Sequence, residues 1–499
     1  MVEQNFQAKT PLLDAIKTYV EDSHAAFYTP GHKQGRGVSQ TLLDLLGSQV
    51  FKADLTELEN LDNLSTPEGV IKEAQDLAAT AFGAEESWFL VNGSTGGIIA
   101  AILATCGDGE KIILPRNVHK SAISGLILSG AIPVFVQPEY DPILDIAHSI
   151  TPEGVANALK KHPDAKAVMM VYPTYYGVCG NVEAIANLAH QYNIPLLVDE
   201  AHGPHFAFHP DLPATALSKG ADLTVQSIHK VLSGLTQASI LHVQGERIDR
   251  DRLNKALQLV QTTSPSYLLL ASLDAARQQM ALYGKDLMIQ TLQLSKIARE
   301  QISQIPQLSV LELYPSAGFV NLDRTRLTVI VSELGLTGFA AEHLLTQQGV
   351  LAEFSSVKHL TFIITLGNTQ TDIEKLVQSF QKLAQEHQGE KLLANLPEAM
   401  YIFKVFSDNK MPKTSPRQAF FAATETVPIK RAVTRICAET ICPYPPGIPV
   451  LMPGEVITPD ALEYLLNIQV IGSEITGCAD ATLKTLKVVK DEYCANSNK

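Results

Sequence analysis

The chain has 499 residues, of which 45% are hydrophobic and 18% charged, and its formal net charge is −13. This length favours two or three domains, and the composition is that of an ordinary soluble protein. The acidic balance disfavours nucleic acid and anionic membranes as partners. No uncharged apolar run approaches the roughly 20 residues of a membrane span, and the N-terminus has no signal-like apolar core, so we expect a cytoplasmic protein.

An amphipathic helix is predicted in PLLDAIKTYVEDSHAAF, followed by a turn in YTPGHKQGRG. Between about 70 and 245, helical segments such as VIKEAQDLAATAFG alternate with short apolar runs, namely SWFLV, KIILP, IPVFV, AVMMVYP, IPLLVDE and LTVQS. Such alternation predicts βαβ units and a mostly parallel sheet between helices. The runs are too apolar for half-exposed strands, which indicates strands covered on both faces.

The pattern of predicted helices and strands changes after residue 280. Long helical stretches are joined by a few strands, LTVIVSEL and HLTFIITL, and the tail contains the turn-rich ICPYPPGIPVLMPGE. We therefore expect an N-terminal helical segment at 1–50, a large α/β domain at 51–280, a small α+β domain at 281–390 and a C-terminal domain at 391–499.

The six cysteines are scattered, and none belongs to a CxxC pair. Cys437 and Cys442 are close together in CAETIC, but no second pair or histidine cluster completes a zinc site. We expect free thiols and no bound metal.

A turn rich in small residues follows the run SWFLV. In LVNGSTGGIIAAILATCGDG, Gly93, Ser94 and Thr95 would open a helix, where free backbone N–H groups and hydroxyls can hold a phosphate. The turn is neither GxGxxG nor a P-loop. By itself it is equally compatible with a plain helix cap.

Three further residues stand near the ends of predicted strands. Asp199 follows IPLLV, where a carboxylate could pair with a protonated ring nitrogen or cap a helix. His119, in PRNVHKSAISGL, could stack on a planar ring or lie on the surface. Lys230, in SIHKVLSGLTQAS, is a surface charge unless a partly dry pocket lowers its pKa, in which case its neutral amine can attack an aldehyde.

Together these residues match the needs of pyridoxal 5'-phosphate. That cofactor requires phosphate donors, a ring-stacking partner, a carboxylate for its ring nitrogen and a Schiff-base lysine. The combination is far more specific than any one member.

Several motifs closely resemble the bacterial Orn/Lys/Arg decarboxylase family, from about residue 8 to about 480. They include FYTPGHKQG, FKADLTELENLDNL, VNGSTGG, HKSAISGL, YPTYYGVCGNV, VDEAHGPHF, SIHKVLSGLTQAS and PYPPGIPVLMPGE. The resemblance implies a fold-type-I, pyridoxal-phosphate-dependent enzyme. In that fold an aspartate aminotransferase-like large domain is followed by smaller α+β domains.

The resemblance also implies roles around the cofactor ring. Lys230, in the family's S-x-H-K, would carry the cofactor covalently. Asp199 would pair with the ring nitrogen, while His119 and Ala201 would lie on opposite faces of the ring. The phosphate would be bound by residues of the two hydroxyl-bearing turns: Gly93, Ser94, Thr95, Ser227 and His229.

The resemblance further bears on assembly. Thr263 and Ser264 resemble the family segment that reaches the partner subunit's cofactor, so we expect a homodimer or a dimer of dimers with shared active sites. The first shared motif begins at Tyr28, which leaves no room for the N-terminal wing of larger members. We therefore expect a short form rather than a decamer.

The expected reaction is decarboxylation of a basic amino acid to its amine, most simply arginine to agmatine in polyamine biosynthesis, with lysine and ornithine as alternatives. His229 or Lys230 would return the proton to Cα. A cationic substrate side chain needs a carboxylate partner. Four candidates are named for it, each of which could equally be a solvated or capping group: Asp54, Glu57, Asp62 and Glu455.

Three other functions are weighed against this one. Another fold-type-I reaction, such as transamination, aldol cleavage or desulfuration, would use the same cofactor residues. A non-catalytic regulatory paralogue is disfavoured by the intact Lys230, Asp199 and His119. A Rossmann-type nucleotide-binding protein is disfavoured by the missing glycine fingerprint.

Overall fold

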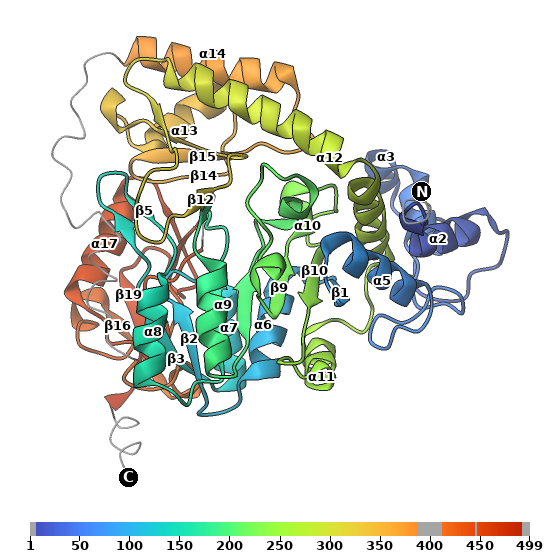
Figure 1. The fold of residues 1–499 in the computed structure, drawn as a ribbon, viewed down its shortest axis with the longest axis horizontal. Coiled ribbons are helices and arrows are strands. Elements are labelled where there is room, and N and C mark those ends of the chain that lie inside the picture. The colour runs from blue at the N-terminus through green and yellow to red at the C-terminus, as the bar shows by residue number, and fades with distance from the viewer. Residues whose placement is uncertain (1–5, 388–411, 445–446, 492–499) are drawn as a thin grey trace. The chain divides into compact units, whose positions relative to one another are not determined.

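Figure 1 shows the chain as a computed structural model, which describes residues 6–387, 412–444 and 447–491. The chain divides into two compact units. The first comprises Met1–Ala104 with Val198–Ile289, and the second comprises Thr105–Leu197 with Gln290–Lys499. These units cut the chain at other points than the four segments expected from the sequence, because stretches far apart in the sequence pack together.

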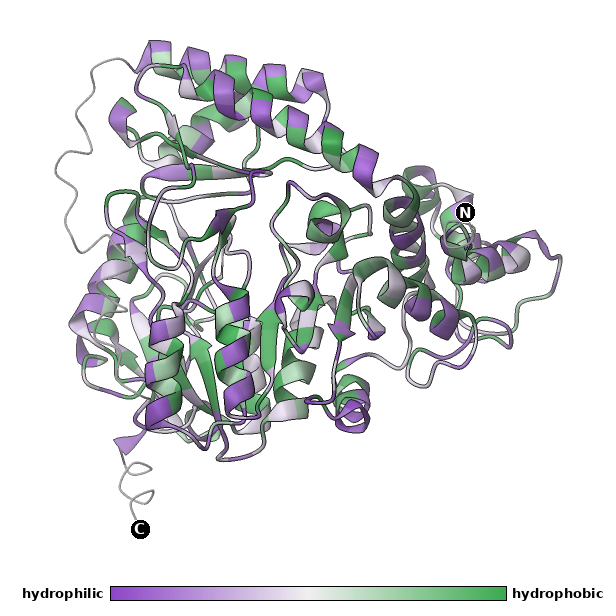
Figure 2. Cartoon of the chain, in the orientation of Figure 1, coloured by the Kyte–Doolittle hydropathy of each residue, from purple (hydrophilic) through white to green (hydrophobic). Residues whose placement is uncertain are grey.

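The main sheet has seven strands in the order β1-β10-β9-β8-β6-β2-β3. β2 runs parallel to β3 and β6, whereas β10 is antiparallel to β1 and β9. The expected fold class is therefore confirmed, and the six predicted apolar runs form strands. Figure 2 shows these strands as hydrophobic. The strands are β1 (Glu86–Leu90), β2 (Lys111–Pro115), β3 (Ile132–Val136), β6 (Ala167–Val171), β8 (Leu196–Asp199), β9 (Leu223–Gln226) and β10 (Ser239–Val243).

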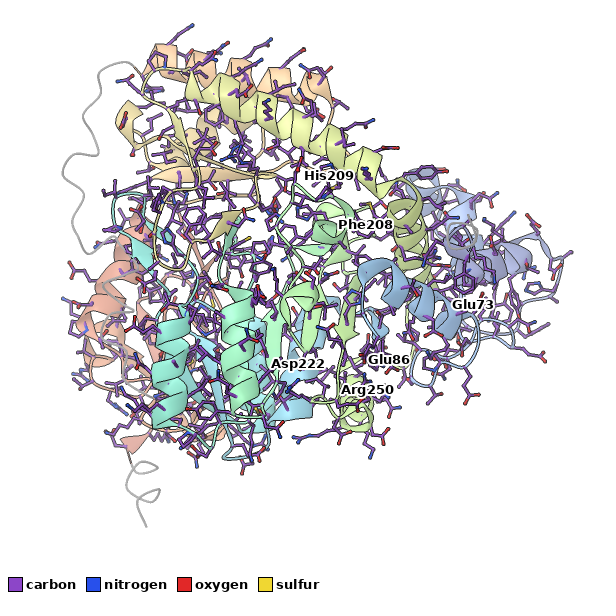
Figure 3. The ribbon with its side chains drawn as sticks, in the orientation of Figure 1. Glu73, Glu86, Phe208, His209, Asp222 and Arg250 are labelled. Atoms are coloured by element: carbon purple, nitrogen blue, oxygen red, sulfur yellow. The ribbon has the colours of Figure 1, made fainter. Side chains whose placement is uncertain are left out.

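The first unit surrounds β1, β9 and β10 with helices. Arg250 on α11 forms ion pairs with Glu85 at 2.9 Å and Glu86 at 3.1 Å, which fasten α11 to the start of β1 (Figure 3). Phe208 packs edge-on against Phe82. The helices are α2 (Pro11–Glu21), α3 (Gln40–Leu46), α4 (Ser48–Ala53), α5 (Val70–Phe82), α6 (Gly93–Thr105), η1 (Pro204–Phe208), η2 (Leu217–Lys219), α10 (Ile228–Val231), α11 (Arg250–Val260) and the part of α12 (Tyr267–Ser303) up to Ile289.

A buried ion pair anchors the N-terminal segment within the first unit. Asp274 and Arg277 on α12 are 0% and 1% exposed and pair with each other. Asp274 accepts the backbone N–H groups of Leu12 at 3.1 Å and Leu13 at 3.3 Å. Arg277 donates to the carbonyl oxygen of Gln7. The pair therefore satisfies the first turn of α2 as well as its own charges.

The second unit begins with the helices that follow β2, β3 and β6. α8 contacts β2 and β3, and α8 and α9 lie side by side, with their hydrophilic faces turned outward (Figures 1 and 2). The elements of this part are α7 (Lys120–Ser129), β4 (Tyr140–Asp141), β5 (Ile146–Ala147), α8 (Pro152–Lys161), β7 (Val178–Cys179) and α9 (Val182–Gln191).

The C-terminal part of α12 and residues 309–386 form an α+β layer whose hydrophobic core includes Ala298 and Ile302 of α12 as well as Leu360. Its sheet has the order β11-β13-β15-β14, and α13 packs on both α14 and β15. The elements are β11 (Ser309–Val310), β12 (Asn321–Leu322), β13 (Arg326–Ile330), η3 (Ser332–Leu334), α13 (Gly338–Gln347), β14 (Phe354–Ser355), β15 (His359–Ile363) and α14 (Gln370–Glu386).

The described part of the C-terminal region has a separate core that includes Cys437, Leu465 and Val488. Its two small sheets pair β16 with β19 and β17 with β18. The elements are α16 (Pro416–Phe421), β16 (Thr424–Pro428), η5 (Ile429–Arg431), β17 (Cys442–Tyr444), α17 (Pro459–Val470), β18 (Glu474–Thr476) and β19 (Thr485–Val489). In the part of the chain that the structure describes, no helix is both long enough and apolar enough to cross a membrane.

Replacing Asp274 by Ala should lower the free energy of unfolding by about 3–5 kcal/mol, because Arg277 would stay buried without its counter-charge. Urea denaturation followed by circular dichroism measures the change. The matched control is Asp14→Ala, which removes an exposed ion pair with Lys17 and should change stability by less than about 1 kcal/mol. Equal midpoints for the two variants would contradict the anchoring role.

Candidate active site

Lys230 lies in the short connection between β9 and β10. One turn of helix, α10, carries it, and its backbone N–H bonds to the carbonyl oxygen of Ser227 at 3.2 Å. Nζ of Lys230 lies 3.0 Å from Nε2 of His202. The connection reverses the chain direction, since β10 pairs antiparallel with β9. The lysine is thereby fixed at the end of a central strand.

Asp199 ends β8 and is 7% exposed. Its Oδ1 accepts the backbone N–H of Ala201 at 3.2 Å. Burial raises the pKa of Asp199, and the nearby charge of Lys230 acts to lower it. The structure thus brings Asp199 and Lys230 together, as the sequence predicted, in a setting where the carboxylate needs a cation.

Two hydroxyls meet at the start of α6. The Oγ atoms of Ser94 and the fully buried Ser227 are 2.7 Å apart. Gly97, in the same first turn, has no room for a side chain, because a Cβ would lie 2.6 Å from Leu90 and 2.7 Å from Val225. The first-turn N–H groups of a helix lack intrahelical partners and favour an anion. The arrangement therefore fits a phosphate.

Gly93 and Thr95 are the residues before and after Ser94 in this turn. Gly93 has φ +69°, in the left-handed region that favours glycine, and so it sets the entry of the chain into α6. The side chain of Thr95 is exposed. Their contribution to phosphate binding stays a prediction.

His229 is turned toward a carbonyl. Its Nδ1 lies 3.0 Å from the oxygen of Ala238, and since a carbonyl only accepts, Nδ1 carries a proton. Nε2 is then an acceptor in the neutral ring, so that nitrogen could donate to a phosphate only when the ring is cationic. Ala201 is 6% exposed, and its carbonyl accepts the N–H of Ser227 at 3.3 Å.

Sequence reasoning missed His202. It stands three residues after Asp199 in VDEAH, and its ring is 7% exposed. The only signal was its position just after the strand-end carboxylates. Glu200 differs from its neighbour Asp199, since it accepts the N–H of Ala216 and the amide of Gln226, both at 2.8 Å, and burial raises its pKa to about 8. Glu200 is therefore largely neutral at pH 7.

His119 belongs to the second unit, and its position relative to Lys230 stays a prediction. It caps the N-terminus of α7, where its Nδ1 accepts the N–H of Ser121 at 3.2 Å. The N–H of the next residue, Lys120, bonds to the carbonyl oxygen of Gly447 at 3.3 Å. The histidine is therefore held against the turn-rich C-terminal motif.

Two of the candidate substrate carboxylates have internal partners. Asp62, at φ +67°, accepts backbone N–H groups that include those of Gly69 at 2.7 Å and Ile71 at 3.1 Å, and it thereby caps α5. Asp54 pairs with His32 at 3.1 Å. Glu57 is partly buried, and burial raises its pKa. Of these three carboxylates, Glu57 therefore remains the best candidate to bind a cationic substrate group.

The fourth candidate, Glu455, is also paired. Its Oε2 lies 3.0 Å from the guanidinium of Arg116 and accepts the N–H of Met452 at 3.0 Å. Arg116 also donates to the carbonyl oxygens of Pro449 and Val450. These bonds tie the C-terminal motif to the end of β2. Through these contacts Glu455 stabilises the packing of the C-terminal motif. That it also binds the substrate stays a prediction.

Thr263 and Ser264 lie in an exposed turn just before α12. The N–H of Ser264 bonds to the hydroxyl of Thr262 at 3.1 Å. Among residues 6–387, 412–444 and 447–491, no three His, Cys, Asp or Glu side chains gather as a metal site.

The sheet and the strand-end residues define an α/β protein of the fold-type-I class. Two solved structures share this fold. The lysine decarboxylase LdcF of Francisella novicida matches with a TM-score of 0.81 and 23% identity over 96% of this chain and 81% of that one. The constitutive lysine decarboxylase of E. coli matches with a TM-score of 0.80 and 22% identity over 97% and 82%.

The chain belongs to the Orn/Lys/Arg decarboxylase family. The model of the family's major domain matches residues 10–319, and that of its C-terminal domain matches residues 398–485. The arginine decarboxylase of Bacillus subtilis strain 168 is 39% identical over 97% of this chain and 99% of its own length. The arginine decarboxylase of Halalkalibacterium halodurans is 41% identical over 97% and 98%.

Replacing Glu455 by Gln should lower the free energy of unfolding by about 1.5–3 kcal/mol, because a charge-assisted bond to the buried Arg116 becomes a neutral one. Differential scanning calorimetry gives the change. The exposed Glu463 on α17 supplies the control, since Glu463→Gln should leave the melting curve in place. Unchanged stability of Glu455→Gln together with a raised KM would instead assign Glu455 to the substrate.

Proposed function

We propose that this chain is a pyridoxal-phosphate-dependent decarboxylase that converts arginine to agmatine and CO2. The observation that carries the proposal is the 39–41% identity, over nearly the full length, to two relatives named arginine decarboxylase. The juxtaposition of Lys230 and Asp199 supports it, because both groups that this chemistry needs lie near each other, Asp199 buried and Lys230 partly buried. Lysine and ornithine are the alternative substrates.

The cluster around Lys230 fits the cofactor. Lys230 would hold it through Nζ, and Ser94 and Ser227 would bind its phosphate at the start of α6. When bound, pyridoxal phosphate supplies the sink for the electron pair left on Cα as CO2 departs. Asp199 would hold a proton at the ring nitrogen, because a buried carboxylate gains from a cation beside it.

Lys230 would act twice in each turnover. Its amine would hold the cofactor when no substrate is bound and would be free while the substrate occupies the site. The free amine, 3.0 Å from His202, would hold the proton that Cα receives in place of CO2. His119 would cover one face of the ring and exclude water from it.

We extend the proposal to the assembly and its setting. The chain would act in the cytoplasm as a homodimer or a dimer of dimers. The exposed turn that holds Thr263 and Ser264 would reach the cofactor of the partner subunit. Mixing two inactive variants tests this. One is Lys230→Ala, and the other combines Thr263→Ala with Ser264→Ala. Shared sites predict partial activity when the two are mixed.

Purified protein with pyridoxal phosphate should release agmatine and CO2 from arginine, and little or no amine from lysine or ornithine. Product analysis by chromatography, with the three amino acids incubated separately, makes the measurement. Cadaverine or putrescine as the main product would keep the decarboxylation and correct the substrate. A bound cofactor with no CO2 from any of the three would overturn the proposed function.

Lys230→Ala should reduce turnover by more than a thousandfold and remove the visible absorbance of the lysine-linked cofactor, because no other amine takes that place. Lys255→Ala is the matched control, since this lysine is exposed on α11. Asp199→Ala should lose most activity while still binding phosphate. Full activity of Lys230→Ala would end the mechanism.

A further inference from the structure

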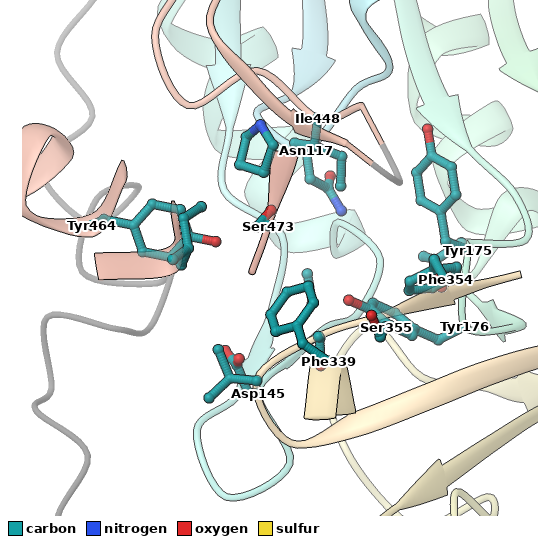
Figure 4. Close-up of a pocket in the computed structure, with 16 residues that line it drawn as sticks. Asn117, Asp145, Tyr175, Tyr176, Phe339, Phe354, Ser355, Ile448, Tyr464 and Ser473 are labelled. Atoms are coloured by element: carbon teal, nitrogen blue, oxygen red, sulfur yellow. The ribbon is translucent and has the colours of Figure 1, made fainter. Parts of the chain in front are cut away.

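A cavity lies wholly within the second unit (Figure 4). It has a volume of about 80 Å³, which is room for a head group of a few non-hydrogen atoms. Aromatic rings supply much of its wall: Tyr175, Tyr176, Phe339, Phe354 and Tyr464. The faces of such rings carry negative potential, which favours a flat or compact cation.

One carboxyl group, that of Asp145, lines this cavity. β4 and β5 pair as a hairpin, and Asp145 ends its turn at φ +59°, a conformation that Asp tolerates. The side chain of Asp141 holds the same turn by accepting the N–H groups of Ile143 at 2.7 Å and Leu144 at 2.9 Å. The hairpin therefore places Asp145 beside Phe339 of α13 and Tyr464 of α17, as Figure 4 shows.

The groups around Asp145 leave its charge poorly compensated. The hydroxyl of Tyr140 donates to it, and burial raises its pKa to about 7. Lys358 acts to lower that pKa, but its ammonium donates to the carbonyl oxygens of Pro142 at 3.2 Å and Ile143 at 2.7 Å.

The other titratable neighbours are neutral at pH 7. Burial lowers the pKa of His359 to about 4, and its ring approaches the backbone oxygen of Asp145 at 3.4 Å. Burial and the charge of Asp145 raise the pKa values of Tyr140, Tyr176 and Tyr464 above their usual range. A cation that entered the cavity would therefore meet one carboxyl group and no cationic group other than Lys358 among these neighbours.

We propose that this cavity binds the head group of a small organic cation, a guanidinium or a primary ammonium on an apolar stem, with Asp145 as its counter-ion. The aromatic walls would stack on the head group and the stem, and the carboxylate would accept its N–H groups. The site uses neither Lys230 nor a cofactor, so it goes beyond the proposed decarboxylation. Both the substrate and the amine product of that reaction carry such a head group.

The test uses the full-length protein with its cofactor and n-butylguanidinium as the probe, because this compound has no amine to react at Lys230. Isothermal titration calorimetry in two buffers of different ionisation enthalpy measures affinity and proton release together. Below pH 7 the free Asp145 is protonated and must lose that proton to pair with the cation. We expect release of about one proton at pH 6, almost none at pH 8.5, and about tenfold weaker binding for each pH unit below 7.

Asp145→Asn should weaken binding at pH 8 at least tenfold and abolish the proton release. Asp164→Asn is the control, because it makes the same change at an exposed carboxylate that pairs with Lys111 outside the cavity wall, and it should behave as the wild type. Phe339→Leu removes one ring without touching the carboxylate, so it should weaken binding and keep the proton release. This second variant keeps the test valid if Asp145→Asn does not fold.

Competition separates the two sources of the cation. Displacement of the probe by agmatine or by arginine, measured in Lys230→Ala so that arginine is not converted to agmatine, supports the site and identifies the ligand. No binding of the probe, or binding without proton release that is unchanged in Asp145→Asn, would overturn it. Because agmatine formation is measured separately, loss of this inference is distinguishable from failure of the proposed function.

Discussion

The attraction between Asp199 and Lys230 is the interaction on which the candidate active site depends. A carboxylate that is 7% exposed is costly to ionise, and Lys230 supplies the charge that opposes this cost. The neighbouring Glu200 accepts two hydrogen bonds, and burial raises its pKa to about 8. The two adjacent carboxyl groups therefore differ in their neighbours: an amine lies near Asp199, whereas Glu200 is hydrogen-bonded to two N–H donors.

Much of this arrangement could be predicted from the sequence because it depends on local order. Each apolar run is followed directly by its polar residue, and the carboxyl ends of parallel strands share one edge of a sheet. Ser94, Asp199, Ser227 and Lys230 could therefore be grouped before any coordinates. The sequence did not predict β10, whose residues are SILHV. Nothing in the segment between LTVQS and SILHV indicates that the chain reverses there and that β10 pairs antiparallel with β9.

Contacts between distant residues could not be predicted in the same way. The partner of Glu455 is Arg116, at the end of a strand more than three hundred residues earlier, and the pattern LMPGE gives no sign of it. For Asp62 the sequence left substrate binding and helix capping open, and the fold shows that it caps α5 through several backbone N–H groups. His202 was not predicted as a site residue. It lies close to Lys230 in the fold, but the two residues belong to different motifs in the sequence.

Asp145 belongs with these long-range cases, and it differs from Asp199 in one respect. Asp199 has Lys230 as its counter-ion, whereas the ammonium of Lys358 is bonded to two backbone carbonyl oxygens and the pKa of Asp145 is about 7. Decarboxylation changes a basic amino acid only at Cα and leaves its cationic head group intact. A site that recognises the head group alone would therefore bind substrate and product with similar affinity. It would respond to the total pool of such cations, and acid pH would empty it as Asp145 takes up its proton.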